Sequence, residues 1–303
     1  MEFNWMDLLA AFGGGLFGAA IGGLPAFIFT GLVVLAGVAA GLGGSSYDLV
    51  GGIAFGPIFG PHVAFGGGVA AAAYAARKDI MPTGGKDITA GLAGLGNPMV
   101  LLVGGLFGMG GYLVQKGLAT FLTGYTDTVA VTVILSALVV RLMFGKTGIF
   151  GTPTKEALKA GRFTPSGAAV WAPWQQDWVQ VLTIGLGASF VSAWIALQFA
   201  GLDPKVAGLG GVVGFGISAF SLLFLQFGVK VPITHHMTLI AALAATTSGN
   251  LIIGVIFGML SAVLGEVVSR LFQIHGDTHI DPPANAIWVM TLVVLVLGKT
   301  GIF

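Results

Sequence analysis

The sequence GKTGIF occupies residues 145–150 and recurs letter for letter at residues 298–303. Each copy closes an apolar segment, and shorter matches precede it in the same order in both parts of the chain. These matches are Gly-Asn at 96–97 and 249–250, Phe-Gly-Met at 107–109 and 257–259, and Asp-Thr at 127–128 and 277–278. Membrane transport proteins are often duplicated in this way. The sequence therefore predicts a first transmembrane repeat at residues 1–150, a polar linker at 151–165 and a second transmembrane repeat at 166–303.

The composition indicates the class of protein that is duplicated. Only 8% of the 303 residues are charged and 55% are hydrophobic, with a mean hydropathy of +0.95, whereas soluble domains carry about 25% charged residues. We expect an all-α, polytopic integral membrane protein surrounded by the lipid bilayer, because its apolar stretches approach the roughly 17–25 residues that cross a membrane. The expected segments are residues 7–20, 25–42, 49–76, 98–114 and 129–144, followed by 177–199, 206–227, 231–245, 251–268 and 284–297.

Five segments per half is an odd number, so the second half would enter the membrane from the opposite side and form an inverted repeat. The third segment of each half is irregular: residues 49–76 contain Pro57, Pro61 and many glycines, and residues 231–245 are short. We expect broken or re-entrant helices there, which are tolerated at membrane depth where they are buried in protein or line a wet cavity. If both segments only re-enter, the count becomes even and the repeats become parallel.

The loop charges predict an orientation. If every segment crosses, one face carries most of the basic residues, which places that face in the cytoplasm and both termini outside the cell membrane. The basic residues of that face are Arg77, Lys78, Lys86, Lys146, Lys155, Lys159, Arg162, Lys230 and Arg270. The other face carries Lys116, Lys205 and Lys299.

Three histidines beside prolines begin the third segments: His62 in the first half and the pair His235 and His236 in the second. A broken helix exposes backbone N–H groups and a dipole end that can hold an anion or a dipolar solute, and histidine can exchange a proton near neutral pH. These residues are therefore candidates for a substrate path. The alternative is that they cap a helix end or satisfy a neighbouring carbonyl.

Asp127 and Asp277 precede the last segment of each half, and Asn97 and Asn250 precede the fourth. Asp and Asn are preferred helix N-caps, because their side-chain oxygens accept bonds from unpaired backbone N–H groups. Capping is the simplest interpretation of all four residues. The functional alternative adds them to the substrate path, as gate carboxylates or as ligands for a solute or ion.

Glu266 lies four residues before Arg270, so the two side chains share one helical face and can pair. A carboxylate inside a membrane is a candidate for a proton relay. A position at the membrane boundary is the alternative, because the equivalent position in the first half carries Lys116.

The segment around His275, Asp277, His279 and Asp281 places imidazole and carboxylate groups at alternating positions, and such groups can bind a divalent metal. An ordinary surface turn is the alternative, because two prolines follow at 282–283 and the first half has no comparable histidines.

The charge, the cysteine content and the duplication limit the functions that the protein can have. The net charge of +1 and the lack of a basic cluster interleaved with aromatic residues exclude nucleic-acid binding, and the lack of cysteine excludes disulfides and thiolate metal sites. We expect a non-enzymatic permease, either a secondary transporter or a channel, that carries a small molecule or ion between its two halves. No cofactor is assigned. One alternative is a structural membrane protein whose 51 glycines serve assembly into a homo-oligomer or larger complex, and another is an intramembrane metalloenzyme.

Overall fold

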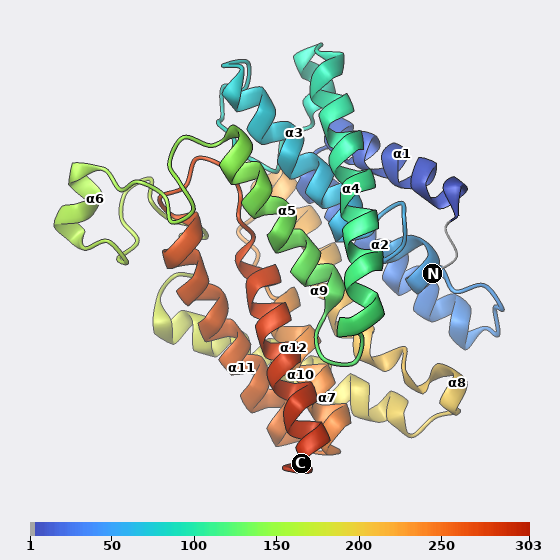
Figure 1. Ribbon diagram of the computed structural model, residues 1–303. Coiled ribbons are helices and arrows are strands. Elements are labelled where there is room, and N and C mark those ends of the chain that lie inside the picture. The colour runs from blue at the N-terminus through green and yellow to red at the C-terminus, as the bar shows by residue number, and fades with distance from the viewer. Residues whose placement is uncertain (1–3) are drawn as a thin grey trace.

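The computed structural model describes residues 4–303, and all regular structure in this range is helical (Figure 1). The elements up to residue 150 are α1 (Trp5–Ile21), α2 (Gly23–Leu42), η1 (Val50–Ala54), η2 (Pro61–Phe65), α3 (Gly66–Arg77), η3 (Leu92–Leu95), α4 (Pro98–Leu122) and α5 (Thr128–Phe144). The elements that follow are α6 (Lys155–Ala160), α7 (Trp178–Ala200), α8 (Pro204–Ala207), α9 (Gly210–Ser221), η4 (Leu222–Phe227), α10 (His235–Ser248), α11 (Leu251–Val268), η5 (Ser269–Gln273) and α12 (Pro282–Thr300).

Six helical stretches within residues 4–303 are long and apolar enough to cross a membrane. They are Gly23–Leu42, Pro98–Leu122, Trp178–Ala200, Pro204–Phe227, Leu251–Gln273 and Pro282–Thr300. The apolar helices Trp5–Ile21 and Thr128–Phe144 are shorter. These helices agree with the expected all-α membrane protein.

Helix α7 carries large side chains outward and small residues inward. On α7, Leu182, Leu186 and Phe190 are exposed at intervals of four residues, whereas Gly185 and Ser189 are buried. This arrangement is the reverse of a water-soluble helix, whose large apolar side chains face the core. It suits a helix whose outer face is solvated by lipid tails, with small residues at the helix contacts.

Glycine allows the backbones of α1, α3 and α4 to touch. A methyl group built on Gly108 of α4 would lie 2.6 Å from the Cα of Gly15 in α1, and one built on Gly67 of α3 would lie 2.8 Å from the same Cα. Since real Cβ atoms do not approach other heavy atoms so closely, no other residue fits these three positions without moving a helix. The hydrophobic effect does not drive helices together in lipid, so this close contact is what holds the three helices.

A second small-residue junction joins α7, α10 and α11. A methyl group on Gly254 of α11 would lie 2.7 Å from the carbonyl oxygen of Ala241 and 2.9 Å from the Cβ of Ala193. Two buried hydroxyls also bridge these helices: Ser192 donates to the carbonyl of Thr238 at 2.6 Å, and Ser261 donates to the carbonyl of His236 at 3.0 Å. Small residues thus build both helix groups.

Two breaks interrupt the helices beside these junctions. In the first, the π-helical turn η1 is followed by a non-helical stretch at 55–60, which contains Pro57 and ends where η2 begins at Pro61. In the second, residues 228–234 leave the helical conformation between η4 and α10. Side chains satisfy the backbone at both places. Thr30 donates to the carbonyl of Phe59 at 2.6 Å, and Gln175 accepts from the backbone N–H of Ile233 at 2.7 Å and donates to its carbonyl at 3.0 Å.

The segment between α5 and α7 is a long connection that contains only the short helix α6, and Figure 1 shows α6 standing out from the side of the helix bundle. The expected polar linker at 151–165 lies within this connection.

Gly108 and Gly110 of α4 provide a matched test of the close helix contact. Gly108→Val should lower the free energy of unfolding by about 1–3 kcal/mol, because the side chain must displace a backbone. Gly110→Val should cost far less, because nothing lies within 4 Å of a Cβ at that position. Thermal unfolding of the purified protein in detergent measures both variants, and equal losses would contradict this packing.

Candidate functional site

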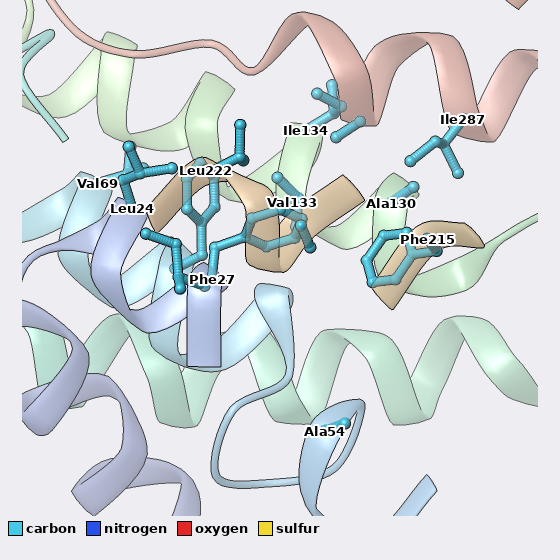
Figure 2. Close-up of a cluster of buried hydrophobic side chains, with 14 of the residues drawn as sticks. Leu24, Phe27, Ala54, Val69, Ala130, Val133, Ile134, Phe215, Leu222 and Ile287 are labelled. Atoms are coloured by element: carbon cyan, nitrogen blue, oxygen red, sulfur yellow. The ribbon is translucent and has the colours of Figure 1, made fainter. Parts of the chain in front are cut away.

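A cavity of about 430 Å³ lies between the helices of residues 4–150 and those of the later part of the chain. Figure 2 shows Phe27 and Ala130 from the first part gathered with Phe215 and Ile287 from the second. The volume of the cavity is within the roughly 300–1,000 Å³ range of small-molecule sites, which are typically apolar with a few polar groups. The walls come from α2, η2, α5, α9, α10 and α12.

Aromatic rings form much of the cavity wall. Phe27 of α2 lies at its centre, with its ring centroid 6.0 Å from that of Phe65 and 5.7 Å from that of Phe215, both edge-on. Phe55, in the break after η1, lies 5.4 Å from Phe215. All four rings line the cavity, so residues from both parts of the chain complete one aromatic wall.

His235 is the predicted path histidine that reaches this cavity. It is the first residue of α10, and its ring centroid lies 4.6 Å from that of Phe27 and 5.9 Å from that of Phe215. The residue is 6% exposed, and its Nδ1 has no hydrogen-bond partner among residues 4–303. A buried imidazole nitrogen without a partner costs free energy, so it is available to a molecule in the cavity.

His62 and His236 lie outside the cavity lining. Both are fully buried, and in the described part of the chain neither nitrogen of either ring has a hydrogen-bond partner. The ring of His236 fills the space left by Gly265, where a methyl group would lie 2.6 Å from Nε2. The alternative interpretation, in which these rings form a hydrogen bond with a neighbouring carbonyl, is therefore wrong for His62 and His236.

Two carboxylates line the cavity, and each lies at the start of a helix. Asp127 caps α5 and accepts from the backbone N–H of Ala130 at 2.8 Å, and Asp281 caps α12 and accepts from that of Ala284 at 2.7 Å. Asp281 also pairs with His279, with 3.1 Å between Oδ1 and Nε2. Asp127 makes no ion pair with any residue of 4–303.

The capping interpretation of Asp277 is wrong. The cap of α12 is Asp281, four residues later, because prolines at 282–283 occupy the first helical positions, where their missing N–H and fixed φ are favoured. Asp277 instead accepts from the backbone N–H of Lys146 at 2.6 Å and from the hydroxyl of Thr147 at 2.7 Å. It joins the loop after α5 to the loop before α12 and does not line the central cavity.

Arg141 of α5 is a functional candidate that the sequence analysis missed, although an arginine inside an apolar segment was a visible signal. Its side chain is 1% exposed. The guanidinium donates to the hydroxyl and carbonyl of Thr278, at 2.5 and 2.7 Å, and to the carbonyls of Gly148, Ile149 and Phe272 at 3.1–3.3 Å. Arg141 and Asp277 therefore hold the same two loops, which fixes where α12 begins.

The candidate metal ligands are not brought together. His275 Nε2 lies 2.6 Å from the carbonyl oxygen of Arg162, whereas His279 lies between Gln273, at 2.9 Å, and Asp281. No three His, Cys, Asp or Glu side chains within residues 4–303 come close enough to share a metal ion. His279 and Asp281 remain as a hydrogen-bonded pair at the cavity.

The remaining candidates lie away from the cavity. Asn97 accepts from the backbone N–H of Met99 at 3.0 Å and Asn250 from that of Ile252 at 2.8 Å, so both cap their helices as the capping interpretation expects. Glu266 is buried and pairs with Arg270 at 2.8 Å, and the Arg270 guanidinium stacks over Trp178. These contacts anchor the end of α11.

The loop between α3 and α4 covers one end of the cavity with Lys86, Asp87 and Thr89. Burial lowers the pKa of the Lys86 ammonium, the charge of Arg141 lowers it further, and Asp277 opposes both. Burial acts to raise the pKa of the Asp87 carboxyl, but hydrogen bonds, chiefly from the side chains of Thr89 and Thr83, outweigh it and hold this pKa below its usual value. The cavity end therefore carries an ionised carboxylate beside a lysine.

Comparison with known proteins identifies one family. The family model described as a family of unknown function, DUF7973, matches residues 1–168 and again residues 165–303. No curated protein and no solved structure matches the chain.

Single-cysteine labelling tests whether water reaches the cavity, because the chain has no cysteine of its own. Ile287 lines the cavity, whereas Val294, two turns later on the same face of α12, is fully buried and does not. A small water-soluble thiol reagent should modify the Ile287→Cys protein and leave the Val294→Cys protein unmodified, as read by mass spectrometry. Protection of both cysteines would mean that the cavity is closed to water.

Proposed function

The chain belongs to the DUF7973 family, and we propose that it is a permease that carries a small solute through the cavity between two membrane-embedded halves. Each half crosses the membrane five times, with broken third segments, and the halves have opposite orientations. The observation that carries the proposal is the cavity itself, which is lined from both halves and contains polar groups that a purely structural contact does not need.

The duplication is supported by the family model, which matches the chain twice. Similar contacts in the two halves indicate which of their residues are equivalent. Asp127 and Asp281 each accept from the backbone N–H of an alanine three residues on, which pairs these two aspartates with each other. A methyl group on Gly111 would collide with the carbonyl of His62, and the hydroxyl of Ser261 donates to the carbonyl of His236. These contacts support pairing His62 with His236 and leave His235, which lines the cavity, without a counterpart in the first half.

Opposite orientations are supported by the path of the last helix in each half. The backbone N–H of Asp127, before α5, donates to the hydroxyl of Thr291 within α12, at 3.0 Å, and Arg141 near the end of α5 donates to Thr278, before α12 begins. The two helices therefore run antiparallel. Figure 1 shows α12 running away from these loops to the C-terminus at the bottom of the view. Equivalent helices that run in opposite directions are the feature of an inverted repeat.

The membrane orientation follows from the loop charges. The connections at residues 78–97, 145–177 and 274–281 meet at one face, where Lys86 donates to the carbonyl of Ile274 at 3.4 Å and Thr152 to that of His275 at 3.0 Å. This face carries most of the basic loop residues. By the positive-inside rule it is cytoplasmic, in the cell membrane.

Flux through proteoliposomes tests the permease. Stopped-flow light scattering with a panel of small amides, alcohols, amines and carboxylates should show at least one solute crossing faster than in protein-free liposomes. Ala130→Phe, which fills the cavity, should remove this flux, and Leu142→Phe, on the exposed face of the same helix, should retain it. Background flux for the whole panel from folded protein would contradict the proposal and favour a structural role.

A further inference from the structure

Aromatic side chains and hydrogen-bond acceptors from several elements line the cavity. Phe27, Phe55, Phe65 and Phe215 come from four different segments and surround one volume. Aromatic rings carry negative charge on their faces and attract cations placed over them within about 6 Å of the ring centroid. Groups of such rings are the known means of binding quaternary ammonium ions.

The charged groups of the cavity favour the same ligand. Asp127 is partly exposed, and no cationic side chain of residues 4–303 pairs with it. The side chain of Asp281 is 15% exposed although it contacts His279. Both carboxylates lie at helix N-termini, which favour negative charge there. Because an ionised carboxylate without a counter-ion is costly in an apolar cavity, a cationic ligand would be stabilised beside Asp127.

His235 supplies an independent observation. Its Nδ1 has no partner, the residue is more than nine-tenths buried, and the ring lies against Phe27 and Phe215 at the cavity wall. A neutral imidazole has one nitrogen that accepts a hydrogen bond. An ammonium N–H can donate to this nitrogen, whereas a carboxylate or phosphate would meet two carboxylates in the same cavity.

Lys86 is the one lysine or arginine among the lining residues, and its ammonium donates to the carbonyl of Ile274, which does not line the cavity. The titratable groups that face the cavity are Lys86, Asp87, Asp127, His235, His279 and Asp281. Carboxylates outnumber the permanent cations, so the interior favours a positive solute.

We infer that the solute is a small organic cation, a protonated or quaternary amine, bound in the cavity that Phe27 and Phe215 line, with its charge beside Asp127. This inference rests on the proposed permease function for the route by which the solute enters and leaves the cavity. Binding of the cation requires only the cavity itself. Binding and flux can therefore be tested separately.

The test is ligand-induced stabilisation of the purified full-length protein, measured by thermal unfolding and isothermal titration. The cationic probes are methylammonium, tetramethylammonium, choline and benzyltrimethylammonium. The control for choline is 3,3-dimethylbutan-1-ol, in which carbon replaces the charged nitrogen. At least one cation should raise the unfolding temperature, as expected for a ligand that binds the folded state, and the neutral control should bind at least tenfold more weakly than choline.

Asp127→Asn should weaken the binding of the cation at least tenfold. Asparagine is as good an N-cap as aspartate, so helix α5 should be retained while the charge is lost. The matched control is Asp177→Asn, the same change at the N-cap of α7, outside the cavity, which should leave binding unchanged. Phe215→Leu should also weaken binding, whereas Phe190→Leu, on the exposed side of α7, should not.

The inference is overturned if no cation binds, if choline and its neutral control bind equally, or if Asp127→Asn binds like the unmodified protein. Any of these results leaves the flux measurement free to support a permease for neutral solutes. If a cation binds but no solute crosses the membrane, the cation site is supported and the proposed transport function is contradicted.

Discussion

Close contact between helix backbones is the constraint on which the other features of this protein depend. Lipid tails are as apolar as leucine, so large side chains gain little by turning inward, and small residues at Gly15, Gly67 and Gly108 let the helices approach. Many large side chains of the long helices then face outward. Between α2 and α9, the rings of Phe27 and Phe215 pack edge-on against each other, and both line the central cavity.

A second set of contacts decides which polar groups enter that cavity. Arg141 of α5 and Asp277 of the loop before α12 together join the loops at residues 145–150 and 272–278. A buried arginine requires acceptors for all its donors, and these loops supply carbonyls. With the loops held, Pro282 starts α12 and Asp281 is left at the cavity. The loop contacts of Arg141 and Asp277 thus determine that the Asp281 carboxylate lies at the cavity.

The sequence predicted the helical membrane class, the helix break near Pro57 and Pro61 and the caps at Asn97 and Asn250, because these follow from composition and local hydrogen bonding. It assigned the cap of the last helix to Asp277, because the Asp-Thr pair repeats there, whereas the prolines at 282–283 begin the helix after Asp281. It could not separate His235 from His236, which differ by one position and 100° around a helix. The aromatic wall was missed because its rings meet only through tertiary packing.

The most direct measurement is a cryo-EM map of the protein in lipid nanodiscs with choline present. We predict non-protein density in a water-accessible cavity, against the Phe27 and Phe215 rings and beside Asp127, with α5 and α12 running antiparallel at the centre of the bilayer. A cavity filled by side chains, or empty and sealed with the last helices parallel, would contradict a solute path between inverted halves.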